Sequence, residues 1–248
     1  MIVLKSRAEI EKMAVAGKMV AEILAGLREM VAPGVTLIEL DAFAERETLK
    51  RKAKPAFKGY SGFPFSLCCS VNEQVVHGFA TNRVLVPGDI VSLDFGVVYG
   101  GFYGDSAITV PVGKVSETAE RLMKVTEESL YRAIDCTDVS HRLSDISHAV
   151  QSHVEPRGFS VVRDFVGHGI GKELHEGPQI PNFGVPGKGP RLKVGMVLAI
   201  EPMINEKGYD VRVLADGWTA VTADGGLSAH FEHTVAITDN GPLILSKI

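Results

Sequence analysis

The sequence predicts an α+β domain built from two related halves. In each half, two helical segments are followed by several strand-like segments. Each half also has a glycine that precedes an apolar strand with a carboxylate six residues later, at residues 88–94 and 195–201. Such a duplication favours one curved antiparallel sheet with helices on its outer face. We therefore expect a single domain over residues 1–248, with pseudo-symmetric halves at about 1–113 and 114–248.

The composition excludes several other classes of protein. Of the 248 residues, 45% are hydrophobic, which is enough for a sizeable core. The net charge is −4 and no strongly basic block occurs, so we expect no sequence-specific nucleic-acid partner. No apolar run approaches the roughly 18 residues of a membrane span, and the charged N-terminal segment lacks the features of a signal peptide. The three sparse cysteines do not form a disulfide framework, so we expect a cytoplasmic protein.

Two capping boxes predict the first two helices. Ser6 and Glu9 form the first box, and apolar residues at helical spacing follow until a Pro-Gly pair at residues 33–34 ends the run. The second box, at residues 36–39, opens a helix that reaches about Lys50. Both helices are amphipathic, so we expect their charged faces to be solvated.

Strands dominate the rest of the first half. Residues 55–62 form a loop that carries aromatic side chains. Apolar segments then predict four strands, with a hairpin-like stretch at residues 96–101 before the last of them. The predicted strands cover residues 67–71, 74–77, 89–95 and 103–110.

The second half repeats this order. Ser116 caps a helix that reaches about Ile134, and a further helix covers about residues 143–154. Proline and glycine predict a long irregular loop at residues 178–190. The strand-like segments are residues 160–166, 194–200, 211–214, 218–222 and 233–238.

The stretch VGHGIGKELHEG at residues 166–177 is the most unusual in the chain. It places His168 and His175 among glycines, which let a backbone turn sharply and approach a ligand because they have no Cβ atom. Taken alone, it is a glycine-rich turn with two histidines. Its significance depends on what the rest of the chain supplies.

Four carboxylates interrupt strongly apolar strands: Asp94, Asp105, Glu201 and Glu232. Charged residues are rarely buried unless they are paired or bind a metal, and like charges cannot neutralise one another. Two divalent ions would balance a charge of about −4 in a dinuclear hydrolytic site. An imidazole from His168 would complete a ligand set suited to Mn, Fe, Co or Zn rather than Ca. The alternative is a domain without metal, which leaves these carboxylates unpartnered.

Six motifs carry a resemblance to a known family. They are KPAFKGY at residues 54–60, SVNEQVVHG at 70–78, and the shorter LDFG, GHGIG, HEGP and AIEP. Through them, essentially the whole chain resembles the bacterial type I methionine aminopeptidases, which have the pita-bread metallopeptidase fold. The resemblance implies a metal-dependent aminopeptidase that removes the initiator methionine from newly made proteins and prefers a small second residue.

The resemblance also implies a set of metal ligands. Asp94 and Glu232 would contact both divalent ions, Asp105 would chelate the first, and His168 and Glu201 would bind the second. The identity of the metal stays open among Co, Mn, Fe and Zn, because this ligand set accepts each of them.

Three side chains are implied in catalysis. A metal-bound hydroxide would attack the methionine carbonyl, with Glu201 as the general base. His77 and His175 would contact the substrate backbone and stabilise the developing oxyanion and the leaving nitrogen.

An apolar pocket for the methionine side chain is implied as well. Two of its positions depart from the pattern frequent in bacteria, because Phe57 replaces a cysteine and Leu174 replaces a phenylalanine. Both remain apolar, so we expect the preference for methionine to survive. The implied pocket residues are Phe57, Tyr60, Phe63, Cys68, Leu174 and Trp218.

Two further details concern a cation site and a cysteine. Asn72, Gln74 and Ser228 match positions where some family members hold a monovalent cation. Cys69, which follows Cys68, has no role that we can assign.

The implied partners are the N-termini of newly made polypeptides, with the ribosome near its exit tunnel as a docking site. The length of the chain favours a monomer. Two alternatives stay open: a prolidase-type peptidase, which usually carries an extra N-terminal domain, and a non-catalytic binding protein on the same fold. The latter is expected to have lost ligands, whereas all five are present here.

Overall fold

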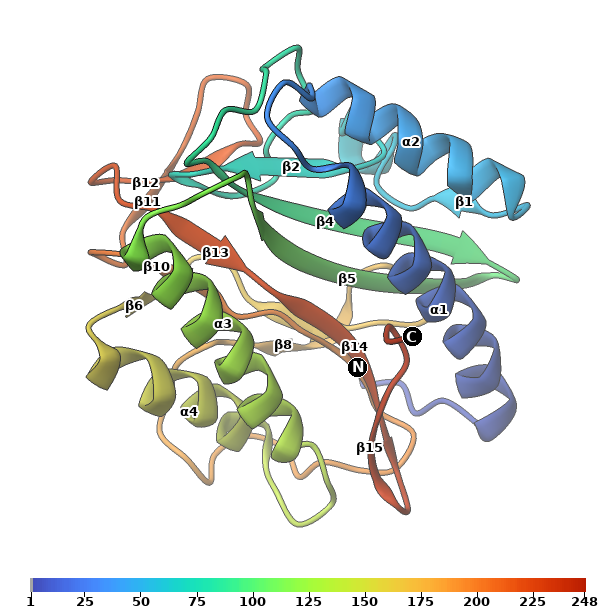
Figure 1. The fold of residues 1–248 in the computed structure, drawn as a ribbon. Helices are drawn as coiled ribbons and strands as arrows, with labels where there is room; N and C mark the ends of the chain where they lie inside the picture. The colour runs from blue at the N-terminus through green and yellow to red at the C-terminus, as the bar shows by residue number, and fades with distance from the viewer. Residues whose placement is uncertain (1) are drawn as a thin grey trace.

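The computed structural model describes residues 2–248 and has an α+β architecture (Figure 1). Within these residues, no helix is both long and apolar enough to span a membrane. The helices are α1 (Arg7–Met30), α2 (Leu37–Lys50), α3 (Glu117–Asp135) and α4 (Leu143–Val154), with 3₁₀ turns η1 (Tyr60–Gly62) and η2 (Glu155–Arg157). The first strands are β1 (Lys54–Pro55), β2 (Cys68–Val71), β3 (Gln74–Val76), β4 (Ile90–Tyr99) and β5 (Phe102–Pro111). The later strands are β6 (Ser160–Val161), β7 (Gly167–Gly169), β8 (Glu176–Ile180), β9 (Val197–Ile200), β10 (Met203–Asn205), β11 (Val211–Val213), β12 (Ala220–Thr222), β13 (Ser228–His230), β14 (Glu232–Thr238) and β15 (Gly241–Ile244).

The central sheet is antiparallel and has the order β1-β4-β5-β14-β9-β7-β8. Strand β2 also pairs with β4, and β15 pairs with β14. Two small sheets, β13-β10-β6 and β11-β12-β3, accompany it. Figure 1 shows the four helices on one side of the strands, and α1 packs on β4 and β5 while α3 packs on β13 and β14. The predicted fold class, a curved antiparallel sheet with helices on its outer face, is confirmed. The single-domain assignment and its two halves stay predictions.

The predicted helix starts are present. Ser6 and Glu9 exchange the two hydrogen bonds of a capping box at the start of α1. At the start of α2, the Glu39 carboxylate accepts from the Thr36 N–H at 2.8 Å. Ser116 caps α3 through its side chain. Caps of this kind are each worth about 1 kcal/mol of stability.

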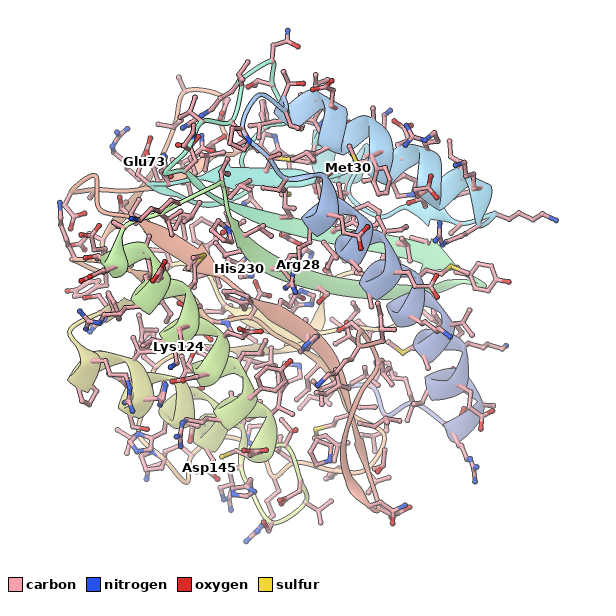
Figure 2. All side chains as sticks on the ribbon, in the orientation of Figure 1. Arg28, Met30, Glu73, Lys124, Asp145 and His230 are labelled. Carbon is pink, nitrogen blue, oxygen red and sulfur yellow. The ribbon has the colours of Figure 1, made fainter. Side chains whose placement is uncertain are left out.

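Each pair of helices buries its own apolar cluster against the sheet. In the first half, Leu27 of α1 and Leu40 of α2 pack with Phe95 of β4. In the second half, Leu122 of α3 and Val150 of α4 pack with strand residues of β9 and β14. Figure 2 shows how densely side chains fill the space between helices and sheet. This packing of the helices against the strands fixes the curvature of the sheet.

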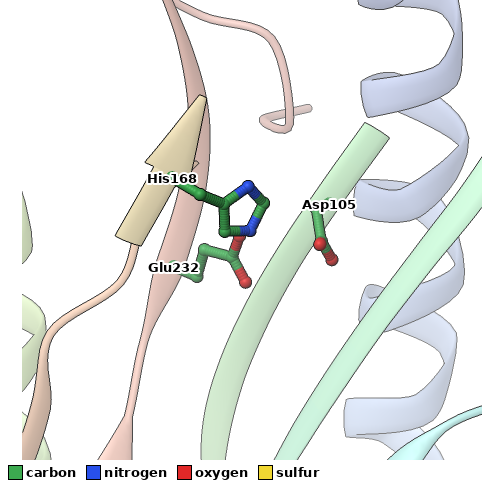
Figure 3. A group of neighbouring side chains, drawn as sticks. All are labelled: Asp105, His168 and Glu232. Atoms are coloured by element: carbon green, nitrogen blue, oxygen red, sulfur yellow. The ribbon is translucent and has the colours of Figure 1, made fainter. Parts of the chain in front are cut away.

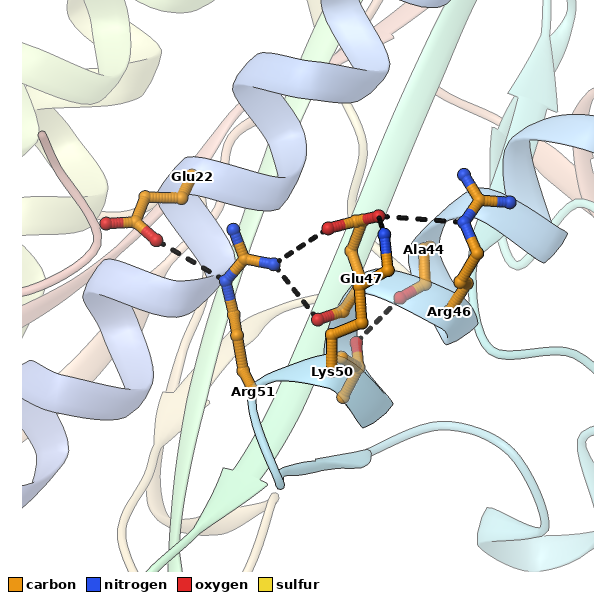
Figure 4. A network of polar contacts seen from close by, with 7 residues as sticks. Glu22, Ala44, Arg46, Glu47, Lys50 and Arg51 are labelled. Atoms are coloured by element: carbon orange, nitrogen blue, oxygen red, sulfur yellow. Dashed lines mark hydrogen bonds and ion pairs between the residues drawn. The ribbon is translucent and has the colours of Figure 1, made fainter.

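A surface network joins the end of α2 to α1 (Figure 4). Arg51 donates to Glu22 of α1 at 3.4 Å and to Glu47 of α2 at 3.1 Å, and Lys50 donates to Glu47 at 2.7 Å. Ion pairs this exposed are worth about 0–1 kcal/mol each, so the apolar cluster rather than this network holds the helices together.

The hairpin between β4 and β5 differs from the prediction. We expected the strand to end at residue 95 and a hairpin-like stretch at residues 96–101. Instead β4 continues to Tyr99, and the turn is confined to Gly100 and Gly101. Both glycines have positive φ angles, 58° and 81°, which suit a tight two-residue turn. The longer strand is stabilised by ten consecutive residue pairs with β5.

Strand assignments in the second half were partly wrong. Residues 160–166 form a strand only at Ser160–Val161, and the expected glycine-rich turn contains β7 instead. The irregular loop predicted from residue 178 begins after β8, which includes Pro178. Proline can occupy an edge strand because no further strand needs its N–H, and β8 is the edge strand of the sheet. The prediction also missed β1, β10, β13 and β15, which are four residues or fewer.

Helix α1 packs against the residue that follows β15, and a glycine allows this close contact. A Cβ atom on Gly17 would lie 2.5 Å from the backbone oxygen of Leu245, so any side chain there would displace α1 from that backbone. Gly26 lies in the same helix, but a Cβ there would meet only the tip of the Phe43 ring.

We expect Gly17→Ala to lower the free energy of unfolding by about 1–3 kcal/mol, the usual effect of overpacking. Gly26→Ala is the matched control, because both changes gain about 1 kcal/mol of helix propensity and only Gly17 faces rigid backbone. Urea unfolding of the two variants gives the comparison. Equal stabilities would show that α1 is not held at Gly17.

Candidate active site

The register of three strands brings three of the predicted carboxylates to one face of the sheet. Asp94 in β4 and Glu232 in β14 both pair with Ala107 of β5, so these residues form one row across the sheet. Residues in one row share a face, as do residues two apart on a strand. Asp105, two residues before Ala107, therefore points the same way as Asp94 and Glu232.

A second row brings the remaining predicted ligands to the same place. His168 in β7 pairs with Ala199 of β9, and Ala199 pairs with Thr234 of β14. Thr234 shares a face with Glu232, two residues before it. Glu201 follows two residues after Ala199. The five predicted metal ligands therefore converge from β4, β5, β7, β14 and the end of β9.

Three of these side chains lie within coordination distance of one another. One donor atom each of Asp105, His168 and Glu232 lies within 4.8 Å of the other two, and all three residues are buried. Figure 3 shows them pointing toward one another from β5, β7 and β14. Glu201 Oε1 lies 3.5 Å from His168 Nε2, which connects the fourth side chain to the group.

Burial raises the pKa of all four carboxylates. It raises the pKa of Asp94 to about 7, although part of that side chain reaches the cavity. It raises the pKa of Asp105, Glu201 and Glu232 well above the ordinary values, and repulsion from neighbouring carboxylates raises each further.

The cluster fits a bound divalent metal. Within residues 2–248, Asp94 Oδ1, Asp105 Oδ1 and Glu232 Oε1 are buried and have no hydrogen-bond partner. Orphaned carboxylate oxygens are costly unless a cation satisfies them. Carboxylates with an imidazole form a mixed O/N donor set that suits first-row divalent metals.

His168 presents a lone pair to this cluster. Its Nδ1 lies 2.9 Å from the carbonyl oxygen of Gly169, so Nδ1–H donates there. Burial lowers the pKa of His168 to about 4, so at neutral pH the ring is uncharged and Nε2 has a free lone pair. Metal-binding histidines are held in this tautomer by their second nitrogen. Gly169 makes room for β7, because a Cβ there would lie 2.2 Å from the backbone oxygen of Gly177.

His175 is oriented by Tyr60. The Tyr60 hydroxyl lies 2.7 Å from His175 Nδ1. Burial lowers the pKa of His175 and raises the pKa of Tyr60, so the neutral ring accepts from the hydroxyl at Nδ1. Its Nε2–H is then free to donate into the cavity. The His175 ring is 4.4 Å from the ring of His168, next to the cluster.

His77 follows β3 in an uncommon backbone conformation. Its φ angle is +59°, a region that residues other than glycine occupy mainly where the surroundings enforce it. Gly78 explains the constraint, since a Cβ there would lie 2.2 Å from the backbone oxygen of Cys69. The His77 ring packs edge-on against Trp218 and Phe165, and burial lowers its pKa to about 4.

One cavity of about 160 Å³ unites the predicted site residues. It is smaller than the roughly 300–1,000 Å³ of sites for drug-sized ligands, so it suits a single side chain. Seven of the lining residues are carboxylates or histidines, and the other six are four aromatic residues with one cysteine and one leucine. Its lining residues are Phe57, Tyr60, Phe63, Cys68, His77, Asp94, Asp105, His168, Leu174, His175, Glu201, Trp218 and Glu232. Every residue predicted from the sequence as catalytic, metal-binding or pocket-forming is among them.

A buried ion pair supports the loop that carries Leu174 and His175. Lys5 Nζ donates to Glu176 Oε2, and the two side chains are only 4% and 10% exposed. The other oxygen of Glu176 accepts from the backbone N–H groups of Lys172 and Glu173. The N-terminal segment thereby fixes one side of the cavity without contacting it.

The predicted monovalent-cation residues lie together but are occupied with protein contacts. The Asn72 carbonyl oxygen accepts from the Ser228 N–H at 2.8 Å. The Asn72 side chain bonds to Asp89 and to the N–H of Ile90, and Gln74 Oε1 accepts from the Val71 N–H. A cation at this place stays a prediction.

The sequence reasoning missed one buried histidine beside the cluster. His230 is 1% exposed, and its Nε2 lies 3.7 Å from Glu201 Oε2. Burial lowers its pKa to about 3. The available signal was its position two residues before Glu232, since alternate residues of a strand share a face.

Comparison with known proteins agrees with this geometry. The sequence profile of Metallopeptidase family M24 matches residues 11–239. The chain belongs to this metallopeptidase family, whose reactions use a divalent metal.

Its full-length relatives define the group within the family. The methionine aminopeptidase of Clostridium perfringens is 57% identical over 248 residues, covering all of both chains. Methionine aminopeptidase 1 of Bacillus subtilis is 52% identical, again over the whole of both chains. The crystal structure of methionine aminopeptidase from Thermotoga maritima superposes with a TM-score of 0.98 at 51% identity, with full coverage of both chains. The resemblance to type I methionine aminopeptidases is confirmed.

A more distant structure shows the fold alone. Prolidase from Pyrococcus furiosus superposes with a TM-score of 0.81 at 24% identity. The match covers 99% of this chain but only 66% of the prolidase chain. The prolidase therefore has a substantial further part that this chain does not match.

We expect Lys5→Met and Glu176→Gln each to destabilise the protein, by up to about 3–5 kcal/mol, because each leaves a buried group without its partner. The double variant should lose less than the sum of the two, since no charge is then left unpaired. Urea unfolding of the four proteins forms the cycle. Strict additivity would mean that the two side chains do not interact.

We expect the stability of the chelator-treated protein to fall between pH 7 and pH 8.5. The cluster carboxylates have raised pKa values when folded, so the native state retains protons that the unfolded chain has released. Stability from such groups is complete below the unfolded pKa and is lost as pH rises through the folded pKa, at about 1.4 kcal/mol per pH unit for each retained proton. The histidines with lowered pKa values act only below about pH 7, outside this window.

Saturating Mn²⁺ should abolish most of this slope, because the metal takes the place of the protons. Urea unfolding at each pH, with chelator and with Mn²⁺, tests this. An identical slope under both conditions would contradict metal binding at the cluster.

Proposed function

We propose that this chain hydrolyses the first peptide bond of newly made polypeptides and releases their N-terminal methionine when the second residue is small. One observation carries the proposal. A single cavity is lined both by the cluster of carboxylates and histidines and by aromatic and apolar side chains. Methionine is apolar, unbranched and adaptable, so it suits an aromatic-lined pocket of this size.

The cluster would hold two divalent ions. Asp94 and Glu232 would contact both, Asp105 the first, and His168 and Glu201 the second. The four carboxylates can balance the charge of two such ions, and their mixture with imidazole admits Co, Mn, Fe or Zn. When bound, the metal supplies Lewis-acid chemistry, which polarises the scissile carbonyl and activates water near neutral pH.

Glu201 would transfer the proton. A general base works best when its pKa is close to the working pH, and burial raises the pKa of Glu201 well above its ordinary value. Its carboxylate would accept a proton from the attacking water and return it to the departing amine.

The two histidines would bind the peptide backbone. His175 is held by Tyr60 with Nε2–H free to donate, so it can stabilise negative charge on the methionine carbonyl oxygen. His77 would contact the substrate backbone and stabilise the leaving nitrogen of the scissile bond. Because both rings have lowered pKa values, they act as neutral donors.

The aromatic and apolar lining would select the first side chain. Phe63 and Trp218 pack edge-to-face with ring centroids 5.1 Å apart, which gives this lining a fixed shape. Phe57 and Leu174 keep their positions apolar although they differ from the pattern frequent in relatives. Cys68 completes the lining as a small, buried side chain.

The wider setting is also part of the proposal. The substrates are nascent polypeptides, and the protein works as a cytoplasmic monomer that meets them at the ribosome. A monovalent cation bound near Asn72, Gln74 and Ser228 would stiffen the loop between β2 and β3.

Peptide hydrolysis tests the function directly. The chelator-stripped protein is given Met-Ala-Ser or Met-Leu-Ser, with and without Mn²⁺ or Co²⁺. Free methionine should appear from Met-Ala-Ser only, and only with metal. No release with any metal, or cleavage of Xaa-Pro peptides instead, would refute the proposal.

Glu201→Gln should lower kcat by at least about 10²–10⁴-fold, the usual contribution of acid–base catalysis, while the fold stays intact. Glu206→Gln is the control, because it lies six residues from β9 and can still accept from the Leu227 N–H. Steady-state kinetics and circular dichroism measure both. A near-normal rate for Glu201→Gln would remove Glu201 from the mechanism.

A further inference from the structure

His230 is a buried polar residue whose side chain makes no hydrogen bond that would stabilise the fold. Its side chain is 1% exposed, and within residues 2–248 neither ring nitrogen has a hydrogen-bond partner. An unpaired buried donor or acceptor costs about 1–3 kcal/mol. A leucine or phenylalanine would avoid this cost, so the imidazole calls for a functional explanation.

The backbone of His230 is fixed in place. Its N–H donates to Thr109 Oγ1 at 2.9 Å, and the same hydroxyl donates to the His230 carbonyl oxygen at 2.8 Å. Ser92 Oγ lies 2.9 Å from Thr109 Oγ1 and completes a buried chain of hydroxyls. These hydrogen bonds restrain the backbone position from which the His230 ring extends. The residue lies in β13, near the centre of the molecule (Figure 2).

The ring faces one acceptor of the site. His230 Nε2 lies 3.7 Å from Glu201 Oε2, whereas Glu201 Oε1 lies 3.5 Å from His168 Nε2. The two carboxylate oxygens of Glu201 therefore face two different histidines. A separation of 3.7 Å exceeds a normal N–H···O distance by about 0.5 Å, and the terminal torsion of a glutamate is soft enough to close it.

A direct metal contact explains His230 less well. The donor atoms within 4.8 Å of one another belong to Asp105, His168 and Glu232, and His230 is outside this group. His168 also has its second nitrogen satisfied by a carbonyl, as metal-binding histidines do, whereas neither nitrogen of His230 is satisfied.

We infer that His230 is a positioning residue, whose Nε2–H donates to Glu201 Oε2 and holds that carboxylate in the orientation needed to bind metal and transfer the proton. Since a carboxylate has two oxygens, His230 restrains one and leaves Oε1 directed at the cluster. The inference rests on the proposed role of Glu201 and adds a residue that the five-ligand set does not contain.

The first experiment uses the unmodified protein loaded with Zn²⁺. Nitrogen-15 labelling of histidine and long-range ¹⁵N–¹H correlation spectra identify which nitrogen carries the proton, and the His230 signals are assigned by their loss in His230→Gln. We expect His230 to be protonated at Nε2, with slow exchange of that proton. A ring protonated only at Nδ1 would overturn the inference.

The second experiment compares three variants. His230→Leu fills most of the space without a donor, and His230→Gln retains an N–H on a side chain of similar reach. His153→Leu is the matched control, because His153 is also buried, in α4, does not line the cavity, and has Nε2 bonded to Glu128. Thermal unfolding, zinc calorimetry and kinetics on Met-Ala-Ser are measured for each.

We expect His230→Leu to lower zinc affinity and kcat by roughly 10–100-fold, as loss of a group that orients a metal ligand does, with little change in KM. His230→Gln should restore most of both losses, and His153→Leu should show neither. Wild-type zinc affinity and kcat in His230→Leu would overturn the inference. Two other results would also overturn it: His230→Gln with zinc affinity and kcat as low as those of His230→Leu, or the loss of one bound zinc ion in both variants.

These readouts distinguish a failure of the proposed function from a failure of the role of His230. If the unmodified protein binds zinc but releases no methionine with any metal, the proposed function fails, and the tautomer and zinc affinities still decide the role of His230. If His230→Leu does not fold, the spectrum of the unmodified protein and the glutamine variant decide it.

Discussion

The mutual repulsion of four carboxylates, two of them buried and two partly buried, is the constraint on which this structure depends. Asp94, Asp105, Glu201 and Glu232 come from separate segments of the sheet, and no lysine or arginine is paired with any of them within residues 2–248. Such a cluster is stable only when protons or metal ions offset its charge. Without them, the carboxylates would move apart if the strands were free to move. The rest of the fold supplies the rigidity that keeps these side chains together.

Two threonines supply much of that rigidity at the junction of β5 and β14. The strands pair directly only at Glu232 with Ala107 and at the next residue pair. On one side of this contact, Thr234 Oγ1 accepts from the Asp105 N–H at 3.1 Å and donates to its carbonyl oxygen at 2.7 Å. On the other side, Thr109 makes the same pair of bonds with His230. Hydroxyl groups thus replace ladder hydrogen bonds where the strands diverge, and they fix Asp105 of the carboxylate cluster and His230 next to it.

The sequence predicted the parts of the molecule that have local causes. The capping residues Ser6 and Glu39 and the spacing of apolar residues placed all four helices, and apolar strands containing a carboxylate located the site. The family resemblance then implied all thirteen cavity residues. What could not be predicted depends on contacts between distant segments. Strand β7 has glycine on both sides of His168, which favours a turn, yet it is a strand because only glycine fits between β8 and β9. His230 was missed for a related reason, since β13 has three residues and only its pairing with β10 makes it a strand.

The shape of the cavity is set by residues that do not line it. Lys5 supports the loop of Leu174 and His175 through Glu176, and the Lys5 N–H donates to the Gly195 carbonyl oxygen at 2.7 Å, ahead of β9. A Cβ on Gly171 would lie 2.4 Å from the Lys5 side chain, so this loop closes only over glycine. The N-terminal segment, at the opposite end of the chain from Glu232, is therefore a structural part of the site. Burial of its lysine is tolerated because the ion pair is enclosed and the loop's N–H groups satisfy the second carboxylate oxygen. Variation in this support would alter the pocket without changing any lining residue, so the lining residues alone do not determine which first side chain the cavity accepts.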